Sequence, residues 1–246
     1  MKIQKTRWIE AQNLEAKQWK ETKNIIKEEW EEAYNKYHKY FCKLEKSLGV
    51  TDKTKILDVG CGPTCISRMI KPGKHYGIDP LAKKFKVEKS LKDIVITKAT
   101  GEKIPYKGGT FHLVICRNAI DHTFSPEQTL KEISRILKPC GHLVLACYVY
   151  NPFINLVKNF GEMLVVFKNV CHPHTFSEKS FDNMANDNFE IIDRKTIYEG
   201  MGPNDFGKKT IQNGKLRILE MIIVILSGLL GYKWFVRERC LLCKKV

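Results

Sequence analysis

Two glycines and two aspartates lie in or next to two consecutive apolar runs. Gly60 and Gly62 follow the apolar run 56–59, and such a glycine pair lets the backbone turn tightly and approach a ligand closely. Asp58 lies within that run. Asp79 ends the next run about twenty residues later, where strand–turn–helix units place an acid on ribose hydroxyls. The pattern predicts a nucleoside-containing cofactor at the end of a strand.

An NAD-dependent oxidoreductase is the less favoured alternative, because its fingerprint uses the same turn and the same acid. The third glycine of that fingerprint would fall at position 65, where this chain has Cys65, and the fingerprint does not require Asp58. A carboxylate beside the turn suits the ammonium group of a methionine moiety instead. We therefore favour a cofactor that contains methionine.

A second group of polar residues follows the apolar run 111–116. His122 is predicted to lie at the carboxyl edge of the sheet, where ligands of open α/β sheets bind, and histidine suits proton removal near neutral pH. We predict His122 as the general base, with Asp121 orienting it and Asn118 contacting the cofactor or the acceptor. The structural alternatives are a histidine that caps the loop and polar residues that only form a turn.

Three further residues are expected on the acceptor side of the site, together with Asp121. His172 and His174 flank Pro173 in a later loop, and Tyr148 ends another apolar run. Loops at this edge of a sheet commonly carry binding residues. A rigid loop that only positions the following helix, and a tyrosine packed in the core, are the alternatives.

The elements that must position these residues alternate between strand and helix patterns. Apolar runs predict strands at residues 55–60, 75–79, 94–99, 111–116, 141–148, 189–198 and 232–242. Helical patterns lie at residues 65–70 and 81–91, and Ser125 and Ser177 are predicted helix N-caps. This alternation predicts an α/β fold, a parallel sheet with helices on both faces.

We divide the chain into a helical extension, residues 1–48, and an α/β domain, residues 49–246. The extension lacks glycine and proline and repeats apolar residues at helical spacing. Inserted helices are expected at about 151–188 and an apolar helix at about 208–231. The apolar segment 216–232 is too short for a bilayer span of about twenty residues, so it either packs on the domain or lies at a membrane interface.

The composition predicts a folded, basic protein. Hydrophobic residues make up 43% and charged residues 28%, and the net charge of +15 will attract anions such as acidic lipids or nucleic acid. Residues 1–15 lack the apolar stretch of a secretory signal, so a cytoplasmic protein is expected, with peripheral contact to an anionic membrane as a further hypothesis. An odd cysteine count of nine indicates free thiols. Cys240 and Cys243 would face opposite sides of a strand, so no metal site is expected.

Four ordered motifs together resemble the class I S-adenosylmethionine-dependent methyltransferases, particularly the type 11 family that includes ubiquinone/menaquinone C-methyltransferases. The motifs are LDVGCGPT (57–64), HYGIDP (75–80), ATGEKIPYKGGTFHLVICRNAIDH (99–122) and LKPCGHLVLA (137–146). In the last of them, Cys140 replaces a common glycine. The resemblance implies a Rossmann-like, mostly parallel seven-stranded sheet of order 3-2-1-4-5-7-6, with its last strand antiparallel and the N-terminal helices as a lid over the cofactor.

The same resemblance implies which residues contact S-adenosylmethionine and its product S-adenosylhomocysteine. The methionine end would meet Asp58, Gly60 and Gly62, the ribose would meet Asp79, and the adenine would lie near Thr100, Gly101 and Glu102. Cys61, Pro80 and Asn118 are further expected cofactor-binding residues. The family usually has aspartate at the position of Thr100, so this chain departs from the pattern there.

The expected reaction is in-line transfer of a methyl group to a small-molecule or lipid-like acceptor. A sulfonium methyl is already electrophilic, so positioning and water exclusion suffice and no metal is required. An RNA methyltransferase is the alternative that the positive charge favours, although the chain has CRNAIDH where enzymes that methylate base amines commonly carry an Asn/Asp-Pro-Pro-aromatic motif. No DNA partner is expected. A non-catalytic protein that binds the cofactor, or a scaffold, is the third hypothesis.

Overall fold

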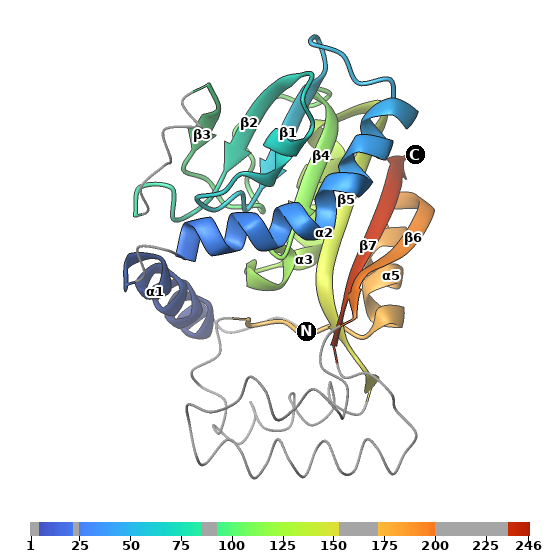
Figure 1. Cartoon of the computed structure of the whole chain (residues 1–246). Helices are drawn as coiled ribbons and strands as arrows, with labels where there is room; N and C mark the ends of the chain where they lie inside the picture. Colours follow the sequence, from blue (N-terminus) through green and yellow to red (C-terminus); the bar gives the residue numbers. More distant parts are fainter. Residues whose placement is uncertain (1–4, 22–24, 85–92, 153–171, 200–235) are drawn as a thin grey trace.

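A single twisted sheet organises the computed structural model, which describes residues 5–21, 25–84, 93–152, 172–199 and 236–246 (Figure 1). The seven strands lie in the order β3-β2-β1-β4-β5-β7-β6, as the motif resemblance implied. Strand β7 is antiparallel to both of its neighbours, and the other pairs are parallel. The strands are β1 (Lys55–Val59), β2 (Lys74–Ile78), β3 (Val95–Thr97), β4 (Phe111–Arg117), β5 (Leu137–Tyr150), β6 (Phe189–Glu199) and β7 (Val236–Lys245).

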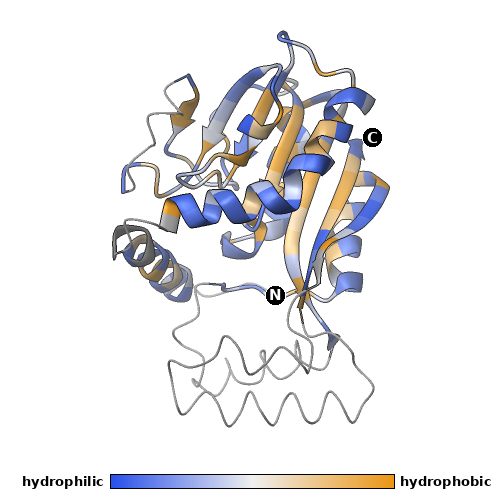
Figure 2. Cartoon of the chain, viewed as in Figure 1, coloured by the Kyte–Doolittle hydropathy of each residue, from blue (hydrophilic) through white to orange (hydrophobic). Residues whose placement is uncertain are grey.

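Apolar side chains on the two faces of the sheet form two large hydrophobic clusters. Tyr37 and Phe41 of helix α2 (Ile25–Ser47) pack on one face, and helices α3 (Pro126–Ile136) and α5 (Glu178–Asn186) pack on the other. Figure 2 shows the central strands as largely hydrophobic and α2 as largely hydrophilic. Cys240 belongs to one cluster and Cys243 to the other, so the predicted opposite orientation of these thiols is confirmed.

Two helices precede the sheet. Helix α1 (Lys5–Glu21) lies beside the start of α2 and away from the sheet's long strands (Figure 1). Helix α2 ends before Gly49, which has a left-handed φ of 59° that glycine adopts without steric cost. This glycine is the predicted stop of the helical extension.

Two helix starts depend on serine caps, as the sequence predicts. The Ser125 hydroxyl accepts a hydrogen bond from the Gln128 amide at 3.2 Å, and Ser177 forms a reciprocal capping box with Ser180. The Glu102 carboxylate accepts the Ser125 amide at 3.1 Å. The start of α3 is thereby tied to the loop after β3.

The glycine-rich turn leads into a shorter helix than predicted. A single 3-10 turn, η1 (Ile66–Met69), replaces the α-helix expected over 65–70. Cys65 precedes it with a φ of 42°, a left-handed conformation that does not continue into an α-helix. Cys140, at the position of a common family glycine, also has a left-handed φ, 58°.

Several predictions fall outside the described residues. These are most of the insertion after residue 152, the apolar helix at about 208–231 with its segment 216–232, and the larger part of the helix expected over 81–91. No helix within the described ranges is long and apolar enough to cross a membrane.

Candidate active site

The turn after β1 presses directly on the loop after β4. Gly60 has a φ of 68°, and a Cβ built on it would lie 2.3 Å from the Cβ of Ala119. The amides of Gly60 and Cys61 both donate to the carbonyl of Ile78, at 2.8 and 3.1 Å. The turn is therefore fastened to β2, and only a residue without a side chain fits between it and the β4 loop.

Asp79 is held rigidly at the end of β2. Its Oδ1 accepts the Leu81 amide at 2.7 Å and its Oδ2 accepts the Gly62 amide at 3.0 Å. Burial raises the pKa of this carboxyl to about 6, although both amide hydrogen bonds act to lower it. The carboxylate thus joins the glycine turn to the second strand, at the position predicted to bind ribose.

Asp58 lies beneath the turn. It is 2% exposed, and its Oδ2 accepts the Ser67 amide at 3.0 Å. Burial raises its pKa to about 7. The carboxylate therefore holds the start of η1. Its predicted contact with the methionine end of a cofactor stays a prediction.

A pocket opens above these residues, with an empty volume of about 500 Å³ that includes its open mouth. Most of the predicted cofactor residues line it, whereas Asp58, Cys61 and Gly62 do not. The lining residues are Trp8, Gln12, Glu15, Val59, Gly60, Asp79, Pro80, Ala99, Thr100, Gly101, Glu102, Asn118, Ala119, His122 and Thr123.

Helix α1 contributes three pocket residues that sequence reasoning missed. Trp8 Nε1 donates to the carbonyl of His122 at 3.0 Å, and Gln12 Nε2 donates to the same oxygen at 3.4 Å. Glu15 Oε2 lies 3.3 Å from His122 Nδ1. The spacing of 8, 12 and 15 places all three on one helix face, which was the available signal. One side of α1 is thus fastened to a single residue of the β4 loop.

The loop after β3 closes the pocket on another side. A Cβ on Gly101 would lie 2.6 Å from Thr129 Cγ2, so this loop packs tightly on α3. The Glu102 carboxylate accepts the amides of Phe124 and Ser125, at 2.6 and 3.1 Å. Its charge therefore serves the start of α3 as well as the pocket lining.

The structure brings the predicted histidines and Asp121 together. His172 Nδ1 lies 2.6 Å from Asp121 Oδ2, and the rings of His122 and His172 are 4.3 Å apart at their centroids. The His174 amide donates to the Asp121 carbonyl at 3.2 Å, and His174 Nε2 lies 3.0 Å from the Thr123 carbonyl oxygen. A loop some fifty residues away in sequence thus docks on the loop after β4.

Two expectations about this group are corrected. Asp121 was expected to orient His122, but its carboxylate contacts His172, because neighbouring residues of the short helix η3 (Ile120–His122) point in different directions. Tyr148 was expected on the acceptor side. It lies instead near α2, where Lys36 Nζ donates to its hydroxyl at 3.1 Å, because side chains alternate along β5.

The charges in this group differ sharply. Burial is the largest influence on His122 and acts to lower its pKa, but Asp121 and Glu15 together raise it to about 9. The two histidines in turn hold the pKa of Asp121 well below its usual range, against the effect of burial. His122 is therefore a cation at neutral pH, placed between two carboxylates.

Asp121, His122 and His172 also form a group whose ligand atoms lie within 4.8 Å of one another, the spacing of a metal site. Within the described ranges, hydrogen bonds and ion pairs already account for these side chains, since Asp121 contacts His172 and Glu15 faces His122. The geometry needs no ion to explain it.

Comparison with known proteins decides the family. The model of a methyltransferase domain matches residues 57–145. The uncharacterized methyltransferase YcgJ of Bacillus subtilis is 23% identical over 142 residues, 54% of this chain and 56% of that protein. A ubiquinone biosynthesis O-methyltransferase of Vibrio campbellii is 26% identical over 141 residues, 53% of this chain and 60% of that protein. Residues 57–145 therefore belong to the methyltransferase domain family.

Solved structures show the same fold. The YcgJ structure from Bacillus subtilis superimposes with a TM-score of 0.60 at 16% identity, covering 85% of this chain and 98% of that chain. Geranyl diphosphate C-methyltransferase of Streptomyces coelicolor gives 0.59 at 13% identity, covering 85% and 79%. The chain spans little more than half the length of the curated relatives that it matches.

The pocket suits the cofactor of this family. S-adenosylmethionine carries a sulfonium and an ammonium charge, and three carboxylates line the pocket of a chain whose net charge is +15, those of Glu15, Asp79 and Glu102. The bare backbone at Gly60 offers a surface that a side chain would fill. Both features fit a cationic ligand that lies against the glycine turn.

Proposed function

We propose that this protein transfers a methyl group from S-adenosylmethionine to a small-molecule acceptor, including lipid-like ones. The observation that supports it most is the convergence of Gly60, Asp79, the loop 100–102 and Asn118 on one pocket at the carboxyl edge of the sheet. When bound, the cofactor supplies a methyl group that is already electrophilic. The protein's own task is to hold the acceptor in line and to exclude water.

Proton removal from the acceptor falls to His172 in this proposal. Its Nδ1 is occupied by Asp121 at 2.6 Å, which fixes the ring and leaves Nε2 to meet an acceptor. The side chain of His172 is 36% exposed, so it can be reached, whereas that of Asp121 is 6% exposed. His122, the first prediction from the sequence, is already protonated at neutral pH and is poorly suited to accept a proton.

The names of the relatives support a small acceptor and leave its reacting atom open. They include a ubiquinone biosynthesis O-methyltransferase, a norajmaline N-methyltransferase and a human thiol S-methyltransferase. One structural neighbour was solved with geranyl diphosphate and S-adenosylhomocysteine. Nucleophiles of oxygen, nitrogen, sulfur and carbon are thus all named among proteins of this fold.

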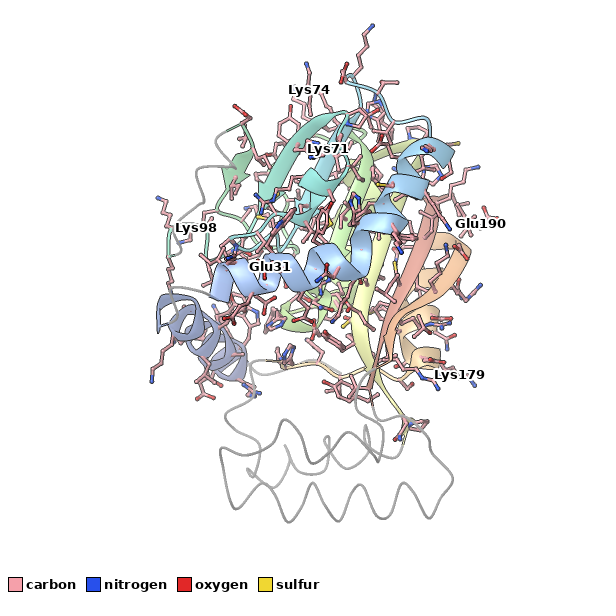
Figure 3. All side chains as sticks on the ribbon, in the orientation of Figure 1. Glu31, Lys71, Lys74, Lys98, Lys179 and Glu190 are labelled. Atoms are coloured by element: carbon pink, nitrogen blue, oxygen red, sulfur yellow. The ribbon has the colours of Figure 1, made fainter. Side chains whose placement is uncertain are left out.

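The proposal is tested with methyl-labelled S-adenosylmethionine and a cell extract. We expect label in the organic or small polar fraction, and loss of that label with Asp79→Ala, because Asp79 fastens the glycine turn at the pocket. The matched control is Lys179→Ala, since Lys179 points outward from α5 (Figure 3). Label in nucleic acid would support the RNA alternative.

Calorimetry separates methyl transfer from the remaining alternatives. We expect S-adenosylhomocysteine to bind and NAD not to bind. The Asp79→Ala variant should bind S-adenosylhomocysteine at least about tenfold more weakly, a loss of about 1.4 kcal/mol in binding free energy. Binding without any turnover would indicate a scaffold, and tight binding of NAD alone would refute the proposal.

A further inference from the structure

A buried glutamate joins three elements at the edge of the pocket. Glu238 of β7 is completely buried, and its Oε1 accepts hydrogen bonds from three donors. These are Tyr37 Oη at 2.7 Å, Arg117 Nε at 2.9 Å and Asn118 Nδ2 at 3.3 Å. Lys36 Nζ lies 3.5 Å from Oε2. A carboxylate buried at this depth is stable only with such partners, and one of them is a pocket residue.

Asn118 is held in an unusual conformation. It follows β4 with a left-handed φ of 47°, and its backbone N–H donates to the Ala146 carbonyl at 2.8 Å. Asparagine adopts this conformation more readily than most residues, because its side chain is short and polar. The backbone therefore places Asn118 at the pocket wall.

Glu238 decides which way that amide is turned. A carboxylate only accepts hydrogen bonds, so the NH2 group of Asn118 must face it. The carbonyl oxygen Oδ1 is left on the other side of the amide. There it is buried and has no hydrogen-bond partner among the described residues. A buried carbonyl oxygen without a partner is costly unless a ligand donates to it.

We propose that Glu238 is a positioning residue: it locks the Asn118 amide so that Oδ1 is presented to the pocket as a hydrogen-bond acceptor. The donor that suits this oxygen is the ammonium group of the methionine part of the cofactor, so the inference rests on the proposed function. Glu238 itself does not line the pocket. It acts through Asn118 alone.

The first test replaces Glu238, the hydrogen-bond acceptor. In Glu238→Met nothing holds the NH2 group, so the amide is free to turn and the affinity for S-adenosylhomocysteine, measured by calorimetry, should fall at least about tenfold. Tyr37→Phe is the matched control, because it removes another donor from the same oxygen. It should lower the melting temperature and leave the affinity within about twofold. A folded Glu238→Met protein with wild-type affinity would overturn the proposal.

A second pair of variants keeps the test valid if Glu238→Met does not fold. Asn118→Ala removes the presented oxygen and should weaken binding at least about tenfold. Glu238→Gln keeps a side-chain carbonyl oxygen that accepts from Tyr37, Arg117 and Asn118, so its affinity should stay within about twofold of the wild-type value. Wild-type affinity of a folded Asn118→Ala protein, or loss of affinity in a folded Glu238→Gln protein, would also overturn the proposal. If the wild-type protein binds no S-adenosylhomocysteine, the proposed function fails instead.

Discussion

At the scale of single residues, the charge on His122 is the feature with the clearest thermodynamic consequence. Its folded pKa of about 9 exceeds the ordinary 6.5, because Asp121 and Glu15 outweigh burial. A raised pKa means that the folded state binds the proton more tightly than the unfolded state. The resulting stability is fully present below pH 6.5 and is lost as the pH rises through 9.

We therefore expect the free energy of unfolding to fall between pH 7 and 9, with His122 contributing about 2 kcal/mol of that fall. The change is measured by urea denaturation across this window. Asp79, with a pKa of about 6, has largely titrated by pH 7, whereas Asp58, with a pKa of about 7, adds a smaller fall of the same sign above pH 7. His122→Gln should flatten the profile. Equal slopes for both proteins would show that His122 is not the cation described.

Substitutions of His172 and His122 should have different effects on the kinetics. Once an acceptor is known, His172→Gln should lower kcat by about 10²–10⁴-fold, the usual contribution of a general base, and leave the affinity for S-adenosylhomocysteine near that of the wild-type protein. His122→Gln should mainly weaken cofactor binding, because the His122 side chain pairs with Glu15 of helix α1 and the residue lines the pocket. The reverse pattern would restore His122 as the base.

Chelation tests the group of Asp121, His122 and His172. We expect methyl transfer to persist in EDTA, since the reaction needs no Lewis acid and these side chains pair with each other or with Glu15. Loss of activity with EDTA and recovery with zinc would identify the group as a metal site, for which its ligand atoms lie close enough.

At the scale of elements, helix α1 is expected to control release of the cofactor. Trp8 donates to the His122 carbonyl and packs edge-on against Phe124, with ring centroids 6.2 Å apart. Trp8→Ala should speed dissociation of S-adenosylhomocysteine at least about tenfold, and Trp8→Phe should do so less, because it keeps an aromatic ring. Stopped-flow fluorescence measures both rates.

The matched control for this experiment is Trp30→Ala in helix α2. Trp30 lies on the Arg68 guanidinium at 3.5 Å and does not line the pocket. Trp30→Ala should lower the free energy of unfolding and leave the dissociation rate of S-adenosylhomocysteine unchanged. Equal rates for wild type and Trp8→Ala would show that α1 does not retain the cofactor.

Local sequence signals located most of the described elements, although not the contacts between them. Apolar runs and the caps Ser125 and Ser177 located the strands and two helices, because these signals act within a few residues. The pairing of Asp121 with His172 depends on a loop about fifty residues away, and no local pattern encodes it. The role of Glu238 in β7 is hidden for the same reason, since the contact joins residues 120 positions apart.

At the scale of the whole molecule, the charge is divided between surface and pocket. The chain carries a net charge of +15, and lysines such as Lys71, Lys74 and Lys98 point into solvent (Figure 3). Carboxylates line the pocket instead. A basic exterior attracts anionic surfaces over a Debye length of about 8 Å at physiological salt, while the acidic pocket keeps its preference for a cation.

This division predicts how the protein meets a lipid-like acceptor. We expect cosedimentation with vesicles that contain anionic phosphatidylserine, little with neutral phosphatidylcholine vesicles, and loss of binding as salt rises from about 0.05 to about 0.5 M, because screening shortens the range of the attraction. Binding that survives high salt would point to insertion of apolar side chains rather than to surface charge. Absence of binding to either vesicle would favour a water-soluble acceptor, since an enzyme that takes its substrate from a membrane must first reside there.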